Sequence, residues 1–122
     1  MKNQAYRMAM LYDFYGDILT DHQKEFYDLY YNEDLSLSEI AENYGISRQG
    51  VRDVIVRAEA ILTELEDKTG IIKRFHTMHD QLNEIQNTVN AINQRNADRY
   101  QDNELEILTT HISSILDQLK QE

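Results

Sequence analysis

The chain of 122 residues contains no cysteine, no proline and only four glycines. The absence of cysteine excludes disulfides and thiolate zinc sites. The scarcity of chain breakers argues against a β fold with many turns, and apolar residues recur with a helical period throughout. An all-α fold is therefore expected. At this length the chain forms one domain, or one small domain with an appendage.

The sequence also lacks a charged-then-apolar leader, and no apolar run approaches the roughly 18 residues that a membrane span needs. We therefore expect a cytoplasmic protein with no membrane span. Basic residues are few: 12 Lys and Arg stand against 22 Asp and Glu, for a net charge of −10. Because phosphate contacts supply most non-specific affinity for nucleic acid, only weak non-specific binding is expected.

Residues 36–62 carry the clearest pattern, which predicts a helix-turn-helix. Ser36 and Glu39 have the S-x-x-E spacing of a capping box, so a first helix is expected from Leu37. Gly45 supplies the left-handed conformation that ends a helix, and Ser47 caps a second one. The expected buried positions are Leu37, Ile40, Ala41 and Tyr44 in the first helix and Val51, Ile55, Ala58 and Leu62 in the second.

The first turns of the second helix carry the candidate nucleic-acid-binding residues. A recognition helix enters the major groove by its N-terminal end. Arg can bond guanine bidentately, and Gln can do the same for adenine. The predicted set is Ser47, Arg48, Gln49, Arg52, Asp53 and Arg57. The alternative is that these residues are solvated surface residues of a unit that binds protein or nothing.

Two further helices are expected before the motif, because a two-helix motif cannot bury its own apolar faces. A helix over residues 3–18 is predicted by the stripe Tyr6, Met10, Leu11, Phe14, Tyr15 and Ile18. Thr20 and Gln23 form a second capping box, which opens a helix to about Glu33. This helix is expected to bury Phe26, Leu29 and Tyr30. Together the four helices form a predicted domain over residues 1–68.

Residues 69–122 are expected to form a helical oligomerisation segment, because their apolar residues have heptad spacing. One seam is Phe75, Met78, Leu82, Ile85, Val89 and Ile92, and the other is Leu105, Leu108, Ile112, Ile115 and Leu119. The two seams can pair within one chain as an antiparallel hairpin, or between chains. We favour a homodimer through these helices. The alternative is a monomer whose hairpin folds back on the N-terminal helices.

No catalytic residue, cofactor or metal site is predicted, and the chain is not expected to be an enzyme. His76, His79 and Asp80 lie close in sequence, with His111 further on, but solvated histidines beside a heptad seam are commoner than a zinc site. Glu64, Glu66 and Asp67 are interpreted as a solvated helix end, since no nucleophile or Gly-rich phosphate loop accompanies them.

The segment from Leu19 to Leu62 resembles the last conserved region of bacterial sigma factors, the part that reads the −35 promoter element. Residues 7–75 more closely resemble the YlxM-like helix-turn-helix proteins of Gram-positive bacteria. The resemblance rests on Arg7-Met8, Leu11-Tyr12-Asp13-Phe14-Tyr15, Leu19-Thr20, Leu29-Tyr30-Tyr31, Asp34-Leu35-Ser36-Leu37, Glu39-Ile40-Ala41, Ser47-Arg48-Gln49, Val51, Asp53, Ile55, Arg57 and Glu59-Ala60. That family commonly has alanine where this chain has Gly50.

The YlxM-like family is known for lying beside the genes of the signal recognition particle, so the resemblance implies a regulatory or accessory role in that pathway. Two hypotheses follow. In the first, the chain is a regulator that binds DNA, or RNA, through Arg48, Gln49 and Arg52. In the second, it reads no DNA sequence and docks on a signal recognition particle component or its RNA. The arginine placement favours the first hypothesis, and the net charge of −10 favours the second.

Overall fold

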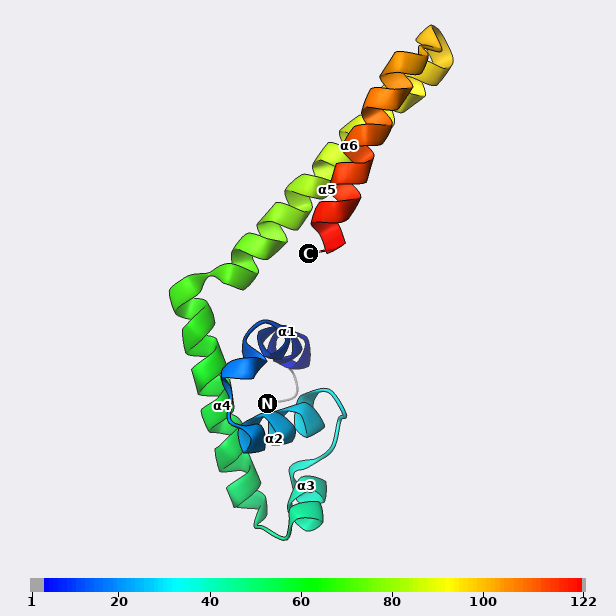
Figure 1. Cartoon of the computed structure of the whole chain (residues 1–122). Coiled ribbons are helices and arrows are strands. Elements are labelled where there is room, and N and C mark those ends of the chain that lie inside the picture. The colour runs from blue at the N-terminus through cyan, green and yellow to red at the C-terminus, as the bar shows by residue number, and fades with distance from the viewer. Residues whose placement is uncertain (1–3, 122) are drawn as a thin grey trace. The chain divides into compact units, whose positions relative to one another are not determined.

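The computed structural model describes residues 4–121 (Figure 1). These residues form six α-helices and contain no strand, which confirms the all-α class. The chain divides into two compact units, and the division falls between Ile72 and Lys73. Over the described residues, no helix combines the length and the apolar character that crossing a membrane requires.

The N-terminal unit contains four α-helices. They are α1 (Ala5–Tyr15), which continues into the 3-10 turn η2 (Gly16–Ile18), then α2 (Asp21–Tyr31), α3 (Leu37–Tyr44) and α4 (Arg48–Thr69). Helices α1, α2 and α3 all pack against the long helix α4 (Figure 1). Helix α4 is therefore the element on which the core of this unit is built.

The helix boundaries in this unit follow from side-chain caps. The Thr20 hydroxyl accepts the N–H of Gln23 at 3.2 Å, and the Gln23 side chain accepts the N–H of Thr20 at 3.1 Å. Ser36 and Glu39 make the same reciprocal pair at 3.0 and 3.2 Å. Both predicted capping boxes are thus confirmed, and each satisfies two N–H groups that a helix start leaves without an intrahelical partner.

The core of the N-terminal unit contains the residues predicted for the helix-turn-helix, with one exception. Ile40, Val51, Ile55, Ala58 and Leu62 have no exposed surface. Tyr44 is 38% exposed, although its ring packs edge-on against the Phe26 ring with centroids 4.8 Å apart. Tyr44 was predicted to be buried and is instead a rim residue, because it ends α3 at the surface.

The stripe predicted for the first helix is wrong at both ends. Tyr6 is 76% exposed and Ile18 is 65% exposed. Met8, Leu11 and Tyr15, at spacings of three and four, form the buried face of α1 instead. Ile18 lies beyond the end of α1 in the 3-10 turn, which has three residues per turn and so changes the direction of its side chain.

Buried tyrosines form hydrogen bonds between the helices of the N-terminal unit. The Tyr31 hydroxyl donates to the Glu59 carboxylate, and the Tyr15 hydroxyl donates to Glu66 Oε1 at 2.6 Å. The Tyr27 hydroxyl donates to the Met8 carbonyl oxygen at 2.7 Å. Burial raises the pKa of Tyr27 and Tyr31 far above the usual value, and the Glu59 carboxylate adds to both shifts. These hydroxyls therefore remain protonated at neutral pH.

The C-terminal unit is an antiparallel helical hairpin. Helix α5 (Ile71–Arg95) passes through the π-helical turn η3 (Asn96–Tyr100) into α6 (Asn103–Gln121), which runs back beside α5 (Figure 1). The Asn96 side chain donates to the Asp102 carbonyl oxygen and accepts the Asp102 N–H, both at 2.9 Å. Pairing within one chain, one of the two arrangements left open by the sequence, is thus present.

The hairpin uses only part of each predicted seam. Leu82 and Val89 on α5 are buried, but Met78, Ile85 and Ile92 are 41–48% exposed. On α6 the buried residues are Thr109 and Leu116, which the sequence did not select, and Leu108, Ile112, Ile115 and Leu119 are 40–60% exposed. Within the hairpin, each apolar stripe is therefore broader than the side that faces the other helix, and pairing of the remaining seam residues between chains stays a prediction.

Candidate nucleic-acid interface

The turn between α3 and α4 is fixed by backbone geometry. Gly45 has φ +66° and ψ +32°, the left-handed conformation that glycine adopts without a Cβ clash. The N–H groups of Gly45 and Ile46 both donate to the Ala41 carbonyl oxygen, the latter at 3.2 Å. These bonds close α3 and direct the chain into α4 after a short turn, as the helix-turn-helix pattern predicted.

The start of α4 is fixed by the Ser47 cap and by the packing of Val51 and Ile55 in the core. The Ser47 hydroxyl accepts the Gly50 N–H at 2.9 Å, so it is engaged in capping. A Cβ added at Gly50 would lie 3.1 Å from that hydroxyl oxygen. Val51 and Ile55 have no exposed surface, so they fix the rotation of α4 about its axis. The exposed residues between them have defined directions as a result.

Four of the predicted site residues lie on adjacent sides of the first turns of α4. Arg48 and Arg52 are exposed and four residues apart, which places them within about 40° of each other around the helix. Gln49 and Asp53 form the next row, with Gln49 Nε2 donating to Asp53 Oδ1 at 3.0 Å. Arg57 continues this row four residues beyond Asp53, and it lies about 180° around the helix from Arg48 and about 140° from Arg52.

Arg48 and Arg52 make no ion pair with any residue in the described range 4–121. An unpaired guanidinium keeps all five of its N–H donors available. The N-terminus of a helix adds a partial positive charge of about half a unit at the same place. These two side chains can therefore bond carboxylate, phosphate or base-edge acceptors without breaking an existing contact.

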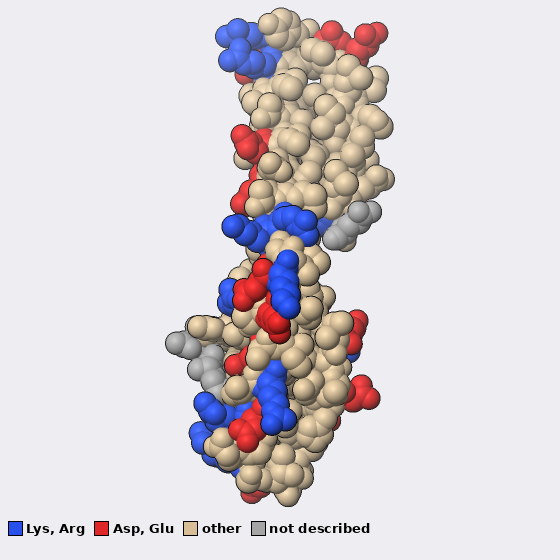
Figure 2. Space-filling view, turned by 90° about the vertical axis from the view of Figure 1, so that its left-hand side faces the viewer, with Lys and Arg blue, Asp and Glu red and all other residues tan. Residues whose placement is uncertain are grey.

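Only this end of the helix has a net positive charge. Residues 48–54 contain two arginines and one aspartate, and further along α4 Arg57 and Lys68 stand against Glu59, Glu64, Glu66 and Asp67. Lys68 is paired with Glu64 at 2.9 Å. Figure 2 shows the result for one face, on which basic and acidic side chains are interleaved and form no broad basic surface. Such a surface suits a small contact area better than a polyanion-binding groove.

The helix-turn-helix formed by α3 and α4 agrees with the protein family whose model the chain matches. Residues 2–103 match the model of a family described as "Putative helix-turn-helix protein, YlxM / p13 like". The chain belongs to the YlxM-like family. The match extends beyond the residues on which the sequence resemblance rested, through α5 and into the first residue of α6.

Individual YlxM-like relatives support the same assignment. The chain is 46% identical over 79 residues to the UPF0122 protein YlxM of Bacillus subtilis (strain 168), covering 65% of this chain and 72% of that protein. It is 45% identical over 91 residues to a UPF0122 protein of Thermoanaerobacter sp. (strain X514), covering 75% and 78%. A UPF0122 protein of Desulforamulus reducens is 42% identical over 88 residues, covering 72% and 75%.

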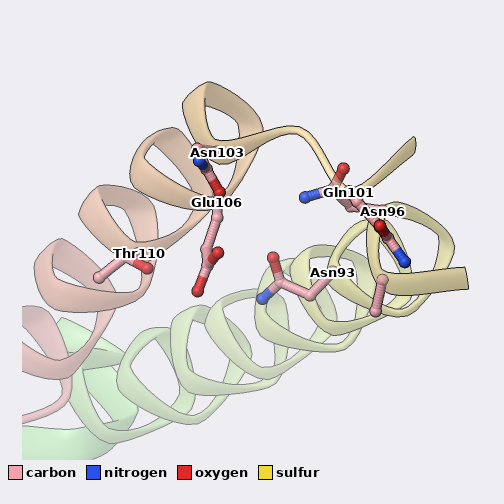
Figure 3. A pocket seen from close by; sticks show the side chains of 7 residues that line it. Asn93, Asn96, Gln101, Asn103, Glu106 and Thr110 are labelled. Atoms are coloured by element: carbon pink, nitrogen blue, oxygen red, sulfur yellow. The ribbon is translucent and has the colours of Figure 1, made fainter. Parts of the chain in front are cut away.

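Sequence reasoning missed a polar hollow at the turn of the hairpin. It measures about 430 Å³ and is lined by Asn93, Asn96, Gln101, Asn103, Glu106 and Thr110. Figure 3 shows Asn93 of α5 and Glu106 of α6 pointing toward each other across it. The contributing residues come from η3 and from the segments on both sides of it, and no single helical spacing joins them. The signal that could have found the hollow is the polar run from Asn93 to Asn103.

The histidines considered as metal ligands do not converge. No cluster of three or more His, Cys, Asp or Glu side chains able to hold a metal ion occurs among the residues that the structure describes. His79 packs its ring against Phe75, with centroids 4.2 Å apart, and its Nε2 is buried without a hydrogen-bond partner. Its surroundings on α5 are therefore those of a packed aromatic side chain.

Proposed function

We propose that this chain is a nucleic-acid-binding regulatory protein that inserts the first turns of α4 into the major groove of DNA. Residues 1–68 bind the nucleic acid, and residues 69–122 pair two copies. The observation that carries the proposal is the pair Arg48 and Arg52, which are exposed, unpaired within the described residues and aligned at the N-terminal end of the helix. That is the end by which recognition helices enter the groove.

The other predicted residues take different parts in this proposal. Gln49 presents its amide to a base edge, and Asp53 orients that amide through the bond at 3.0 Å. Ser47 keeps the helix start in place, since its hydroxyl is already bonded to the Gly50 N–H. Arg57 lies about 140–180° around α4 from Arg52 and Arg48, so we assign it a flanking phosphate contact and no role in base recognition.

The setting of this activity comes from the family resemblance. Because the resemblance to the YlxM-like proteins implies a link to the signal recognition particle, we propose that the chain regulates or assists that pathway in the cytoplasm. The family description names a binding motif and no reaction, so the proposed role is regulatory rather than catalytic.

A DNA-binding measurement with matched variants tests the proposal. The probe is a duplex selected from a random pool by the full-length protein, with a scrambled duplex as reference, at physiological salt. Arg52→Ala should weaken binding to the selected duplex by roughly 5- to 150-fold, the range for losing one good base contact. Arg57→Ala removes the same charge about 140° around α4 from Arg52 and should weaken binding to both duplexes alike, by a smaller factor.

Two results would overturn the proposal: no preference of the wild-type protein for any selected duplex, or unchanged binding by the Arg52→Ala variant. Unfolding curves of both variants should match wild type, because Arg52 and Arg57 are exposed.

A second function is favoured by the interleaved charges of the α4 surface and by the net charge of −10. In this alternative the same fold docks on a signal recognition particle component or its RNA and reads no DNA sequence. A pull-down of the full-length protein from its native cell, with protein and nucleic acid both identified, separates the two. Recovery of signal recognition particle components without genomic DNA would favour docking.

A further inference from the structure

The C-terminal hairpin has its polar and apolar residues in unusual places. Between its helices, beside the buried Leu82, Val89 and Leu116, lie hydrogen-bonded polar side chains: Gln86 donates to Ser113 at 3.3 Å, and the Thr109 hydroxyl donates to Asn93. On its outside lie large apolar side chains that are 40–60% exposed. A two-helix unit that is stable by itself would be expected to bury more of its apolar side chains, because apolar burial supplies most of the driving force.

These exposed residues share one side of the hairpin. We define the apolar face as Met78, Ile85 and Ile92 on α5 and Leu108, Ile112, Ile115 and Leu119 on α6. Successive helix residues are turned by about 100°, so the α5 members lie about 40–80° to one side of the buried Leu82. The α6 members lie about 60–120° from the buried Thr109 in the same rotational sense. In facing antiparallel helices, equal rotations lead to the same side.

Between Met78 and Ile92 on α5, and between Leu108 and Leu119 on α6, no charged side chain lies on the side of the apolar face, and Arg74 borders the face one turn before Met78. On α6, Glu106 and Asp117 are turned about 60–80° from Thr109 in the opposite sense, and on α5, Asp80 and Glu84 lie about 160° from Leu82. Figure 2 shows a face of the hairpin on which charged side chains gather at the two ends and along one edge, with an uncharged strip between them. An apolar centre with a charged rim is the usual composition of a protein interface.

We propose that a second copy of this chain covers the apolar face, so that two hairpins form a four-helix bundle. This inference rests on the homodimer of the proposed function and specifies its interface, but it does not depend on nucleic-acid binding. An uncharged face with isoleucine or leucine at heptad spacing on both helices is complementary to itself, as a twofold interface requires. The side chains that stay exposed in one hairpin would then form the centre of the bundle.

The available area is sufficient for a specific dimer. Helix α6 has 19 residues and is about 28 Å long, and two adjacent helices are about 20 Å wide. A second hairpin laid along this face would bury about 500–600 Å² on each copy, or roughly 1,000–1,200 Å² in total. That total reaches the lower limit for specific interfaces. It predicts a dimer that dissociates measurably at low concentration.

Sedimentation of the full-length protein tests the proposal. Wild type should be a dimer at tens of micromolar. Ile85→Glu combined with Ile115→Glu places two carboxylates in the middle of the apolar face, and should raise the dimer dissociation constant about 100-fold or more. Ile107→Glu is the matched control: Ile107 is 67% exposed, but it lies about 160° from Thr109, away from the apolar face, and should leave the dimer intact.

The outcomes separate this inference from the homodimer itself. A monomeric wild-type protein would overturn both. A wild-type dimer that persists in the double variant would keep the homodimer and place its interface elsewhere. If the double variant loses helix content by circular dichroism, Ile85→Gln combined with Ile115→Gln replaces it with the same readout. A monomeric protein that instead binds an amphipathic helix of another protein through these residues would also overturn the assignment of a second copy.

Discussion

The two units of this chain differ in how completely they bury apolar residues that recur at helical spacing. The N-terminal unit places Phe26, Tyr27, Ile40 and Ile55 entirely out of solvent. In the hairpin the apolar residues at matching helical spacing are divided, with Leu82 at 7% exposure and Ile85 at 46%. Four helices can enclose a side chain from several directions, whereas two helices share only one side. Periodicity therefore predicts which residues line up, and the number of neighbouring helices decides which of them are buried.

Replacing an isoleucine with aspartate in each unit should give the largest difference in stability between the two units. Ile40→Asp puts an unpaired carboxylate at a position with no exposed surface, and should destabilise the N-terminal unit by about 4 kcal/mol or more. Ile107→Asp makes the same change at a residue that is 67% exposed, and should alter stability by less than about 0.5 kcal/mol. Urea unfolding followed by circular dichroism measures both. A native-like midpoint for Ile40→Asp would mean that the core is wrongly described.

Cutting the chain between the units should give a smaller effect that depends on where the cut is made. Ile72 is buried with the N-terminal core, its N–H donates to Glu66 Oε1 at 3.0 Å, and Thr69 bonds the Tyr15 hydroxyl at 2.6 Å. A fragment of residues 1–74 should fold as a monomer. A fragment of residues 1–67 should be less stable by about 2–4 kcal/mol, since it loses one buried isoleucine and these hydrogen bonds.

Thermal unfolding and sedimentation of the two fragments test this expectation. The full-length chain is the reference for the N-terminal transition, which should be close to that of fragment 1–74. Equal stability of the two fragments would show that Thr69 and Ile72 contribute nothing to the core.

Alkaline pH should lower the stability of the tyrosine-rich N-terminal core more than that of the hairpin. The folded-state pKa of Tyr27 and Tyr31 is raised above the unfolded value near 10, mainly by burial. Their contribution to stability is therefore complete below pH 10 and is lost as the pH rises above it, at a slope of up to about 1.4 kcal/mol per pH unit for each tyrosine. Urea midpoints between pH 8 and 11 measure the slope.

The matched variants for this experiment are Tyr31→Phe and Tyr6→Phe. Tyr31→Phe should flatten the alkaline slope, because it removes one of the two buried hydroxyls. Tyr6→Phe changes an exposed ring and should leave the slope as in wild type. A wild-type midpoint that is constant from pH 9 to 11 would contradict the burial of both hydroxyls.

The smallest expected effect is at the exposed start of α4. Gly50→Ala removes the helix penalty of glycine, which is about 0.5–1 kcal/mol. The new Cβ would lie 3.1 Å from the Ser47 hydroxyl, so the cap must shift and part of the gain is lost. We expect a net stabilisation below about 0.5 kcal/mol. In a Ser47→Ala background the same substitution should give the full gain, and a double-mutant cycle on urea midpoints compares the two.

Local signals predicted the N-terminal unit well. The boxes at Thr20 and Ser36 and the turn at Gly45 each depend on residues three or four apart, so their outcome does not require knowledge of the rest of the fold. The errors at Tyr6 and Ile18, and the burial of Thr109 and Leu116 that the sequence did not select, share one physical cause. Each concerns which side of a helix meets a neighbour, and that side is set by residues far away in the sequence.

The candidate site was predictable only as a set of residues on one helix. The relative positions of Arg48, Gln49 and Arg52 follow from helix geometry, so their proximity could be predicted from the sequence. The bond from Gln49 to Asp53 depends on rotamers and was not foreseen, whereas the capping of α4 by Ser47 was predicted and is present. Helix geometry places Arg57 about 40° from Asp53, but about 140–180° from Arg52 and Arg48.

Because exposed and buried residues alternate along α4, substitutions that change binding and substitutions that change stability fall at different positions. Arg48, Gln49, Arg52 and Asp53 are exposed, and the residues between them, such as Val51, support the core. Substitutions at the exposed positions should change stability by less than about 0.5 kcal/mol. Homologues or designed variants could therefore acquire new binding preferences at these four positions while keeping the rest of the unit unchanged.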